Sequence, residues 1–420
     1  MVNGIAAYLF FIIAGRALGA DRYAEFSVLW TLVFFAAPGF MFPLEQEVSR
    51  AVSARRARGF GGGPVIRKAG ALGFALAGIL AVVVLGLSGL ILDHLFDGEV
   101  LLLVGLLIAL PAYALIHLSR GTLSGTGRFA SYGWVLAGEG VIRILAGLAL
   151  ALVGIKVAGA YGLLIALAPL VALLIVLSRE RNLLQPGPEA SWSELSEALG
   201  WLLLGAVLSQ GFVNASVPLV KILAAPGEDA VAGQFQAGLI ISRVPLFLFQ
   251  AVQASLLPKL ASLAAEGRLT DFRTGLKRLV AVVVAIGLAA TVGGFLIGPF
   301  VLRLFFGSEF DELGNADIGY LALASAAFML SMALSQALIA LRGYAKVAAG
   351  WATAIVVLAL VTWLSTDELL LRVELGLVGG SLMSIIAMSV LLAAQMRGGV
   401  PDTVAPLIEE LSPSHEIIEP

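Results

Sequence analysis

The sequence of 420 residues contains no cysteine. Disulfides, thiolate metal ligands and cysteine nucleophiles are therefore excluded. For the same reason, cysteine usage gives no information on the redox state of the compartment. Histidine is also scarce: the three are His94, His117 and His415, and no H-E-x-x-H pair could hold zinc. The glycine-rich GGGPVIRK at 61–68 lacks the spacing of a phosphate-binding loop, which argues against an ATP-driven pump. We predict no metal site and no cofactor.

Charge is the next scarcity. Only 13% of the residues are charged, 60% are hydrophobic, and the mean hydropathy is +0.99. Long apolar runs without alternation favour membrane-spanning helices over a barrel. We predict an all-α polytopic membrane protein, multi-pass, with about twelve spans. These are at 2–15, 24–44, 69–92, 100–118, 130–153, 157–178, 198–223, 231–257, 279–300, 317–341, 347–365 and 374–396.

The connections between spans are short and differ in charge. Those on one side carry eighteen arginines and lysines, and those on the other side carry six. Because basic residues collect on the cytoplasmic side, both termini are predicted to be cytoplasmic. No basic segment precedes the first run, so a cleaved signal peptide is not expected. No connection is long enough for a soluble catalytic domain.

The longest break between spans, SRERNLLQPGPEASWSELSEALG at 178–200, divides the chain into six spans and six spans. Two prolines stop one helix there, and Ser191-x-x-Glu194 offers a capping box for the next. We therefore predict two six-helix lobes, a linker and a disordered cytoplasmic tail that is acidic and proline-containing. Their ranges are 1–183 for the N-terminal lobe, 184–197 for the cytoplasmic linker, 198–397 for the C-terminal lobe and 398–420 for the tail.

Polar residues inside the spans are the main candidates for function. In the eighth span Gln236, Arg243 and Gln250 are spaced by seven and share a helix face. A charged group at this depth costs about 2.5–3.5 kcal/mol, so it normally faces a cavity or a partner. Pro245 removes a backbone donor and predicts a bend beside Arg243. The alternative interpretation of Arg243 is a structural contact between helices.

A second polar stripe follows one face of the seventh span: Gln210, Asn214, Pro218 and Lys221. Lys221 is near the outer boundary, where snorkelling is the alternative explanation. In the fifth span Glu139 and Arg143 have the i, i+4 spacing of an internal ion pair, which could face a cavity or be structural. Amides in either stripe could also simply join helices by hydrogen bonds. Glu45 and Glu47, at the end of the second span, read as interfacial charges.

Three stretches of the sequence resemble the polysaccharide flippases, of O-antigen and teichoic-acid type, of the multidrug/oligosaccharidyl-lipid/polysaccharide exporter (MOP) superfamily. AGRALGADRYAEFSVLWTLVFF (14–35) carries an LG-x-x-x-Y-x-x-F phrase, and PFVLRLFFGSEF (299–310) carries L-x-x-x-FG-x-x-F. FQAVQASLLPKLASLAAEGRLTDFRTGLKRLV (249–280) is similar to the exit of the family's eighth span. The resemblance implies two six-helix bundles around a central, often cationic cavity, alternating access, and a bacterial inner membrane.

The resemblance also implies a substrate, an oligosaccharide linked to a polyprenyl pyrophosphate, carried to the outer face for polysaccharide export. Arg243, with Lys221, would suit the pyrophosphate, and Gln210, Asn214, Gln236 and Gln250 would suit sugar hydroxyls. The expected partners are this lipid-linked oligosaccharide, membrane lipid, and glycosyltransferases or a polymerase of the same pathway, with no nucleic acid. We expect no enzyme activity.

Two other functions remain open. A cation-coupled drug or small-molecule exporter of the same superfamily would need a buried carboxylate, for which Glu139 is the one deep candidate in the predicted spans. A membrane glycan polymerase or ligase would usually present a long outer loop with acidic or histidine chemistry, and the predicted outer loops are short.

Overall fold

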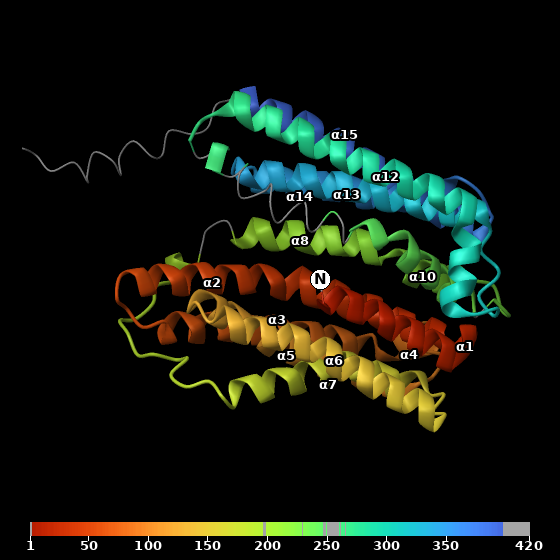
Figure 1. Cartoon of the computed structure of the whole chain (residues 1–420), viewed down its shortest axis with the longest axis horizontal. Coiled ribbons are helices and arrows are strands. Elements are labelled where there is room, and N and C mark those ends of the chain that lie inside the picture. The colour runs from red at the N-terminus through yellow and green to blue at the C-terminus, as the bar shows by residue number, and fades with distance from the viewer. Residues whose placement is uncertain are drawn as a thin grey trace, which may run out of the picture.

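A computed structural model describes residues 2–195, 199–228, 230–246, 249, 260, 262–264 and 266–397. Every regular element in these ranges is a helix, and the longer helices run side by side along the long axis of the molecule (Figure 1). The prediction of an all-α polytopic protein is confirmed. The end of the predicted eighth span, Gln250 and part of the stretch 249–280 lie outside the described residues.

The first half of the chain forms the lower bundle in Figure 1. Its helices are α1 (Val2–Ala36), a π-helical turn (Ala37–Met41), α2 (Phe42–Ala57), α3 (Gly63–Gly86), α4 (Ser88–His94), α5 (Val100–Gly125), α6 (Phe129–Val153) and α7 (Ala158–Leu177).

The second half forms the upper bundle, with α8 and α10 at the middle of the molecule between the two bundles (Figure 1). Its helices are α8 (Leu199–Asn214), α9 (Ser216–Leu223), α10 (Val231–Ser242), α12 (Leu269–Phe306), α13 (Asn315–Ala340), α14 (Tyr344–Leu364) and α15 (Leu369–Arg397). A one-turn 3-10 helix (Trp192–Glu194) precedes them in the connection between the halves.

The first helical stretch, Gly4–Ala57, is 54 residues long and contains two spans. The rings of Phe11 and Trp30 lie 4.3 Å apart, whereas 19 residues of continuous helix would separate them by about 28 Å. The chain therefore folds back between them, at Gly19, whose φ of 76° and ψ of 169° are open to glycine. This hairpin corresponds to the predicted spans 2–15 and 24–44.

Within the described residues nine helices are long and apolar enough to cross a membrane, or ten when α8 and α9, bent by 46°, are counted as one span. The hairpin in the first stretch adds one more, and α10 is the described part of the eighth span. The described residues thus contain eleven candidate spans and the first part of the predicted eighth span.

The second span is longer than predicted. It does not end near residue 44 but continues as α2 to Ala57. Pro38 and Pro43 lack the N–H that an α-helix needs, and the chain passes them in a π-helical turn at Ala37–Met41. The basic segment that was expected to be a loop is therefore largely helical.

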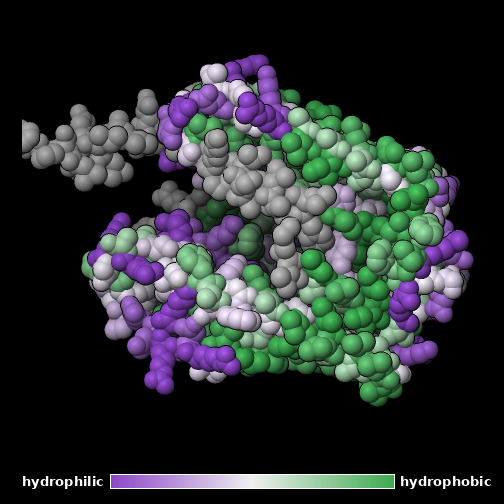
Figure 2. Space-filling model, in the orientation of Figure 1, coloured by the Kyte–Doolittle hydropathy of each residue, from purple (hydrophilic) through white to green (hydrophobic). Residues whose placement is uncertain are grey.

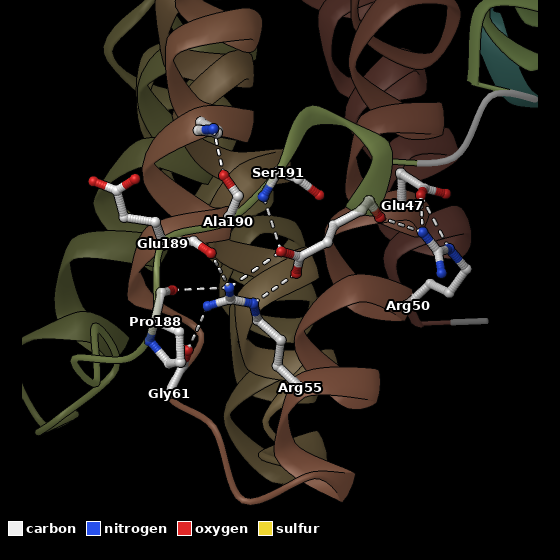
Figure 3. A network of polar contacts seen from close by, with 10 residues as sticks. Glu47, Arg50, Arg55, Gly61, Pro188, Glu189, Ala190 and Ser191 are labelled. Atoms are coloured by element: carbon white, nitrogen blue, oxygen red, sulfur yellow. Dashed lines mark hydrogen bonds and ion pairs between the residues drawn. The ribbon is translucent and has the colours of Figure 1, made fainter.

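The connection between the halves is attached to the first bundle by Arg55 of α2, which is 5% exposed (Figure 3). Its guanidinium donates to the Glu194 carboxylate at 2.7 Å and to the carbonyls of Gly61, Pro188 and Glu189 at 3.0, 2.9 and 3.1 Å. The predicted capping box of Ser191 and Glu194 forms, but on the 3-10 turn instead of on α8.

Candidate functional site

The surface is hollowed between the two bundles at the end where the basic connections lie (Figure 2). At the other end the bundles meet. Arg16 of α1 donates to the carbonyls of Leu304 and Phe305 at 2.7 Å each, and Tyr23 packs against Phe306 and Phe310. The space between the bundles is therefore open at one end and closed at the other.

Arg243 directly follows the last residue of α10, where the helix is interrupted two residues before Pro245, as the predicted bend requires. Its guanidinium donates to the carbonyl of Val213 in α8 at 2.6 Å. It lines a small pocket of about 20 Å³ with Ser325 and Ser381, and the phenol of Tyr8 in the first bundle is within electrostatic range. No carboxylate among the described residues pairs with Arg243.

The predicted seventh and eighth spans are linked at Arg243. The bond from Arg243 reaches Val213, the neighbour of Asn214, and the Asn214 amide donates to the backbone and side-chain oxygens of Gln210 at 3.0 and 3.1 Å. Gln236 is 2% exposed, and its side-chain oxygen has no partner in the described part of the chain. Asn214 and Gln210 thus contact each other on α8, while Arg243 contacts the α8 backbone at Val213.

Lys221 is separate from this group. It lies near the end of α9 at the closed end of the molecule, where its ammonium is 2.6 Å from the carboxylate of Asp97. Asp97 belongs to the α4–α5 connection, so the ion pair joins the two bundles. Snorkelling to the aqueous boundary does not explain Lys221, because its side chain is only 5% exposed. The Asp97 side chain is 37% exposed.

Glu139 and Arg143 form the predicted i, i+4 ion pair on α6. Both are buried, at 4% and 1% exposure, and the guanidinium lies over the Trp30 ring, 5.5 Å from its centroid. The two charges neutralise each other inside the first bundle.

A second buried polar cluster in the first bundle was missed from the sequence. Glu45 is 4% exposed and is not an interfacial charge. One of its oxygens is 2.6 Å from Nδ1 of His117, and the other accepts from Tyr132 at 3.0 Å and lies 3.3 Å from Arg120. These residues come from α2, α5 and α6 and are up to 87 positions apart in the chain, so no local spacing could reveal the cluster.

Glu374 was also missed. It is 0% exposed in α15, and neither carboxylate oxygen has a hydrogen-bond partner among the described residues. The charged groups that act on it most strongly, Asp317 and Glu368, are themselves acidic. In the sequence Glu374 is the first residue of the predicted span 374–396, a position typical of a charge at the membrane boundary. A carboxylate buried without a hydrogen-bond partner is stabilised when a proton or a cation balances its charge.

The guanidinium of Arg243 has the chemistry to bind an anion. Arg243 has spare N–H donors and no acidic partner in the ranges described, and amide groups lie on the adjoining helix face. Phosphate oxygens are the acceptors that a guanidinium binds best, often through two bonds.

No protein-family model matches the chain. It is 28% identical over 376 residues to Uncharacterized protein Rv3630 of Mycobacterium tuberculosis (84% of this chain, 81% of the relative). It is 27% identical over 365 residues to Uncharacterized protein Rv1510 of the same organism (83% of this chain, 79% of the relative).

Among solved structures the chain is similar to a multidrug resistance MATE family transporter of the MOP superfamily in its inward-facing conformation, with a TM-score of 0.74, 16% identity, and 94% and 96% of the two chains covered. An outward-facing conformation of such a transporter gives 0.62, with 16% identity and 94% of each chain covered. A MOP superfamily transporter from Pyrococcus furiosus gives 0.66, with 14% identity and 94% of each chain covered. The chain has the two-bundle MATE-like fold, as the resemblance implied, and the higher score of the inward-facing structure agrees with a hollow at one end.

Proposed function

We propose that this chain is a flippase that carries a polyprenyl-pyrophosphate-linked oligosaccharide from the cytoplasmic to the outer face of a bacterial inner membrane by alternating access. Both termini would be cytoplasmic, and the hollow would face the cytoplasm. The observation that carries the proposal is Arg243, whose guanidinium lies at the interrupted end of α10 and bonds to the carbonyl of Val213 in α8.

The chemistry of such a substrate fits these surroundings. Two phosphates need a cation with several donors, and a guanidinium provides five in a planar fork. The sugars need side chains that both donate and accept, which Gln210, Asn214 and Gln236 do. The polyprenyl chain can remain in the lipid, so the space between the bundles has to hold only the headgroup.

The test is the substitution Arg243→Gln in purified protein reconstituted in vesicles. It removes the charge and keeps a donor. We expect translocation of a fluorescent polyprenyl-pyrophosphate oligosaccharide to fall at least about tenfold, because a charge-assisted bond contributes about 1.5–3 kcal/mol. Arg303→Gln is the matched control, since Arg303 is exposed at the closed end of α12. Translocation by R243Q at the wild-type rate would remove Arg243 from the substrate site.

A cation-coupled exporter of small molecules is the second candidate, and Glu374 favours it. Glu139 no longer serves as the coupling carboxylate, because Arg143 neutralises it. Glu374 is buried without a partner in the described chain, so its charge can be balanced by a proton or a cation that arrives and leaves.

The two candidates predict different effects of Glu374→Gln. In a cation-coupled exporter this change abolishes uptake of a cationic dye into vesicles driven by an imposed proton or sodium gradient. Asp367→Asn, at an exposed position at the same end of the C-terminal bundle, is the matched control. Gradient-driven dye transport that E374Q leaves intact, or no dye transport by the wild type, counts against this second candidate.

A further inference from the structure

A groove outside the space between the bundles lies between α6 and α7, with a cavity volume of about 190 Å³. Apolar side chains form most of it, among them Trp134, Ile142 and Ile175. Trp134 is 70% exposed and Ile175 is 49% exposed, so this side of the first bundle faces lipid. The floor is narrow because Gly138 approaches Ala172 so closely that a Cβ on the glycine would be 3.2 Å from the alanine Cβ.

One end of the groove is polar. It is lined there by Ser131, in the first turn of α6, and by Arg179 and Glu180, just beyond the last residue of α7. The Ser131 hydroxyl and the Arg128 guanidinium both bond to Glu180, and these contacts lower the pKa of that carboxyl. The charges of Arg128 and Glu180 therefore neutralise each other. Arg179 is exposed and has no ion pair within the described residues, which leaves its positive charge at the mouth of the groove.

The length of the groove matches one leaflet. Ser131 and Ile142 are eleven residues apart on α6, which is about 16 Å of helix, and half of a hydrocarbon core is about 15 Å. The charged end lies where the basic connections and Trp134 place the membrane boundary, since tryptophan collects at that level. The groove thus runs from headgroup depth to the middle of the bilayer.

We propose that this groove is a binding site for one anionic diacyl phospholipid of the leaflet at the basic end of the molecule. The lipid phosphate binds the Arg179 guanidinium, and one acyl chain lies between α6 and α7 over Gly138 and Ala172. A positive charge between helix ends selects an anionic headgroup over a zwitterionic one, because only the anionic lipid brings net opposite charge.

The test is native mass spectrometry of the full chain, extracted from vesicles with equal amounts of dioleoyl phosphatidylglycerol and dioleoyl phosphatidylcholine. The wild type is expected to retain phosphatidylglycerol preferentially. Arg179→Gln lowers its retention about fivefold, as expected for the loss of one cation at the membrane surface. Arg67→Gln, the same change at an exposed position on α3 at the same membrane boundary, leaves retention unchanged.

A second pair of variants tests the acyl chain independently of charge. Ile175→Trp fills the groove and lowers retention, whereas Leu174→Trp, at a lipid-facing position of 54% exposure outside the groove, leaves it unchanged. Equal retention of the two lipids, an equal effect of R67Q, or normal retention by I175W would each overturn the proposal. So would displacement of the phospholipid by a polyprenyl phosphate, or a cross-link between two copies through this groove.

Discussion

Charged side chains within the spans are stabilised in three different ways. Arg143 has a carboxylate partner one helical turn away on its own helix. Arg243 has a backbone carbonyl on a neighbouring helix. Glu374 has no partner in the described chain. The cost of desolvating a charge falls with each bond that replaces water, so the last two are the charges with the most to gain from a ligand.

The ion pair of Glu139 and Arg143 is expected to be structural. Arg143→Met leaves a carboxylate buried and unpaired, so it should destabilise the protein by about 3–5 kcal/mol. The double variant E139Q/R143M removes both charges and should recover most of that stability. Thermal unfolding in detergent measures both effects, and a double variant as unstable as R143M would contradict this account.

The residue scale also shows where a sequence is informative. Arg243 and the pair of Glu139 and Arg143 could be predicted because their signals are local: a charge far from a span end, and a spacing of four. Glu45 and His117 belong to different helices, 72 positions apart, and only the packing of the bundle brings them together.

At the scale of elements, the linker between the halves behaves as part of the first bundle. Besides the bonds of Arg55, the Gly63 amide donates to the Gln185 carbonyl at 2.8 Å. A Cβ on Gly61 would be 2.0 Å from the Pro186 carbonyl oxygen, so glycine is required for this approach. Any rotation of the second bundle against the first must therefore begin after Leu195.

Loss of Arg55 should release the linker. Arg55→Gln cannot reach the Glu194 carboxylate and the three carbonyls together. Chymotrypsin should therefore cut at Trp192 at least about tenfold faster, as expected when roughly 1.4 kcal/mol or more of local stability is lost. Arg58→Gln, an exposed neighbour on the same segment, is the control. Cleavage of R55Q at the wild-type rate would show that the linker is fixed by other contacts.

The same attachment should depend on pH. The bond from Arg55 holds the pKa of the Glu194 carboxyl below its ordinary value. The stabilisation from this bond is therefore complete above a pH of about 4.3, the ordinary pKa of a glutamate carboxyl. It is lost as the pH falls through the lowered pKa of Glu194. Proteolysis at Trp192 by an acid-stable protease should accelerate in the wild type below a pH of about 4. The E194Q variant should be cleaved at the faster rate at every pH.

The helices were largely predictable because apolar runs of membrane length leave few alternatives. The turn at Gly19 was placed correctly between two spans. One feature was not predictable: the continuation of the second span to Ala57 depends on a π-helical turn near Pro38 and Pro43. Proline normally predicts a helix end. The predicted second span therefore ended at residue 44, directly after Pro43.

At the scale of the whole molecule, the closed end is held by two polar contacts between the bundles. One is Arg16 on the carbonyls of Leu304 and Phe305, and the other is Lys221 on Asp97. The proposed alternating access requires these contacts to break when the hollow closes and the other end opens. Lys221, predicted from the sequence as a ligand for the substrate, would then act as a latch that holds this end closed.

Breaking the latch should shift the population toward the outward-open form. Because the chain has no cysteine, V157C/S308C places two spin labels on outer connections of the two bundles without removing any native thiol. Lys221→Met should raise the share of the longer distance measured by electron–electron resonance about fivefold, since a pair with one partly exposed partner contributes about 1 kcal/mol. The charge exchange D97K/K221D should restore the wild-type distribution, because it rebuilds the ion pair with its ends reversed. An unchanged distribution in K221M would mean that the aromatic packing of Tyr23 on Phe306 and Phe310 closes this end without the latch.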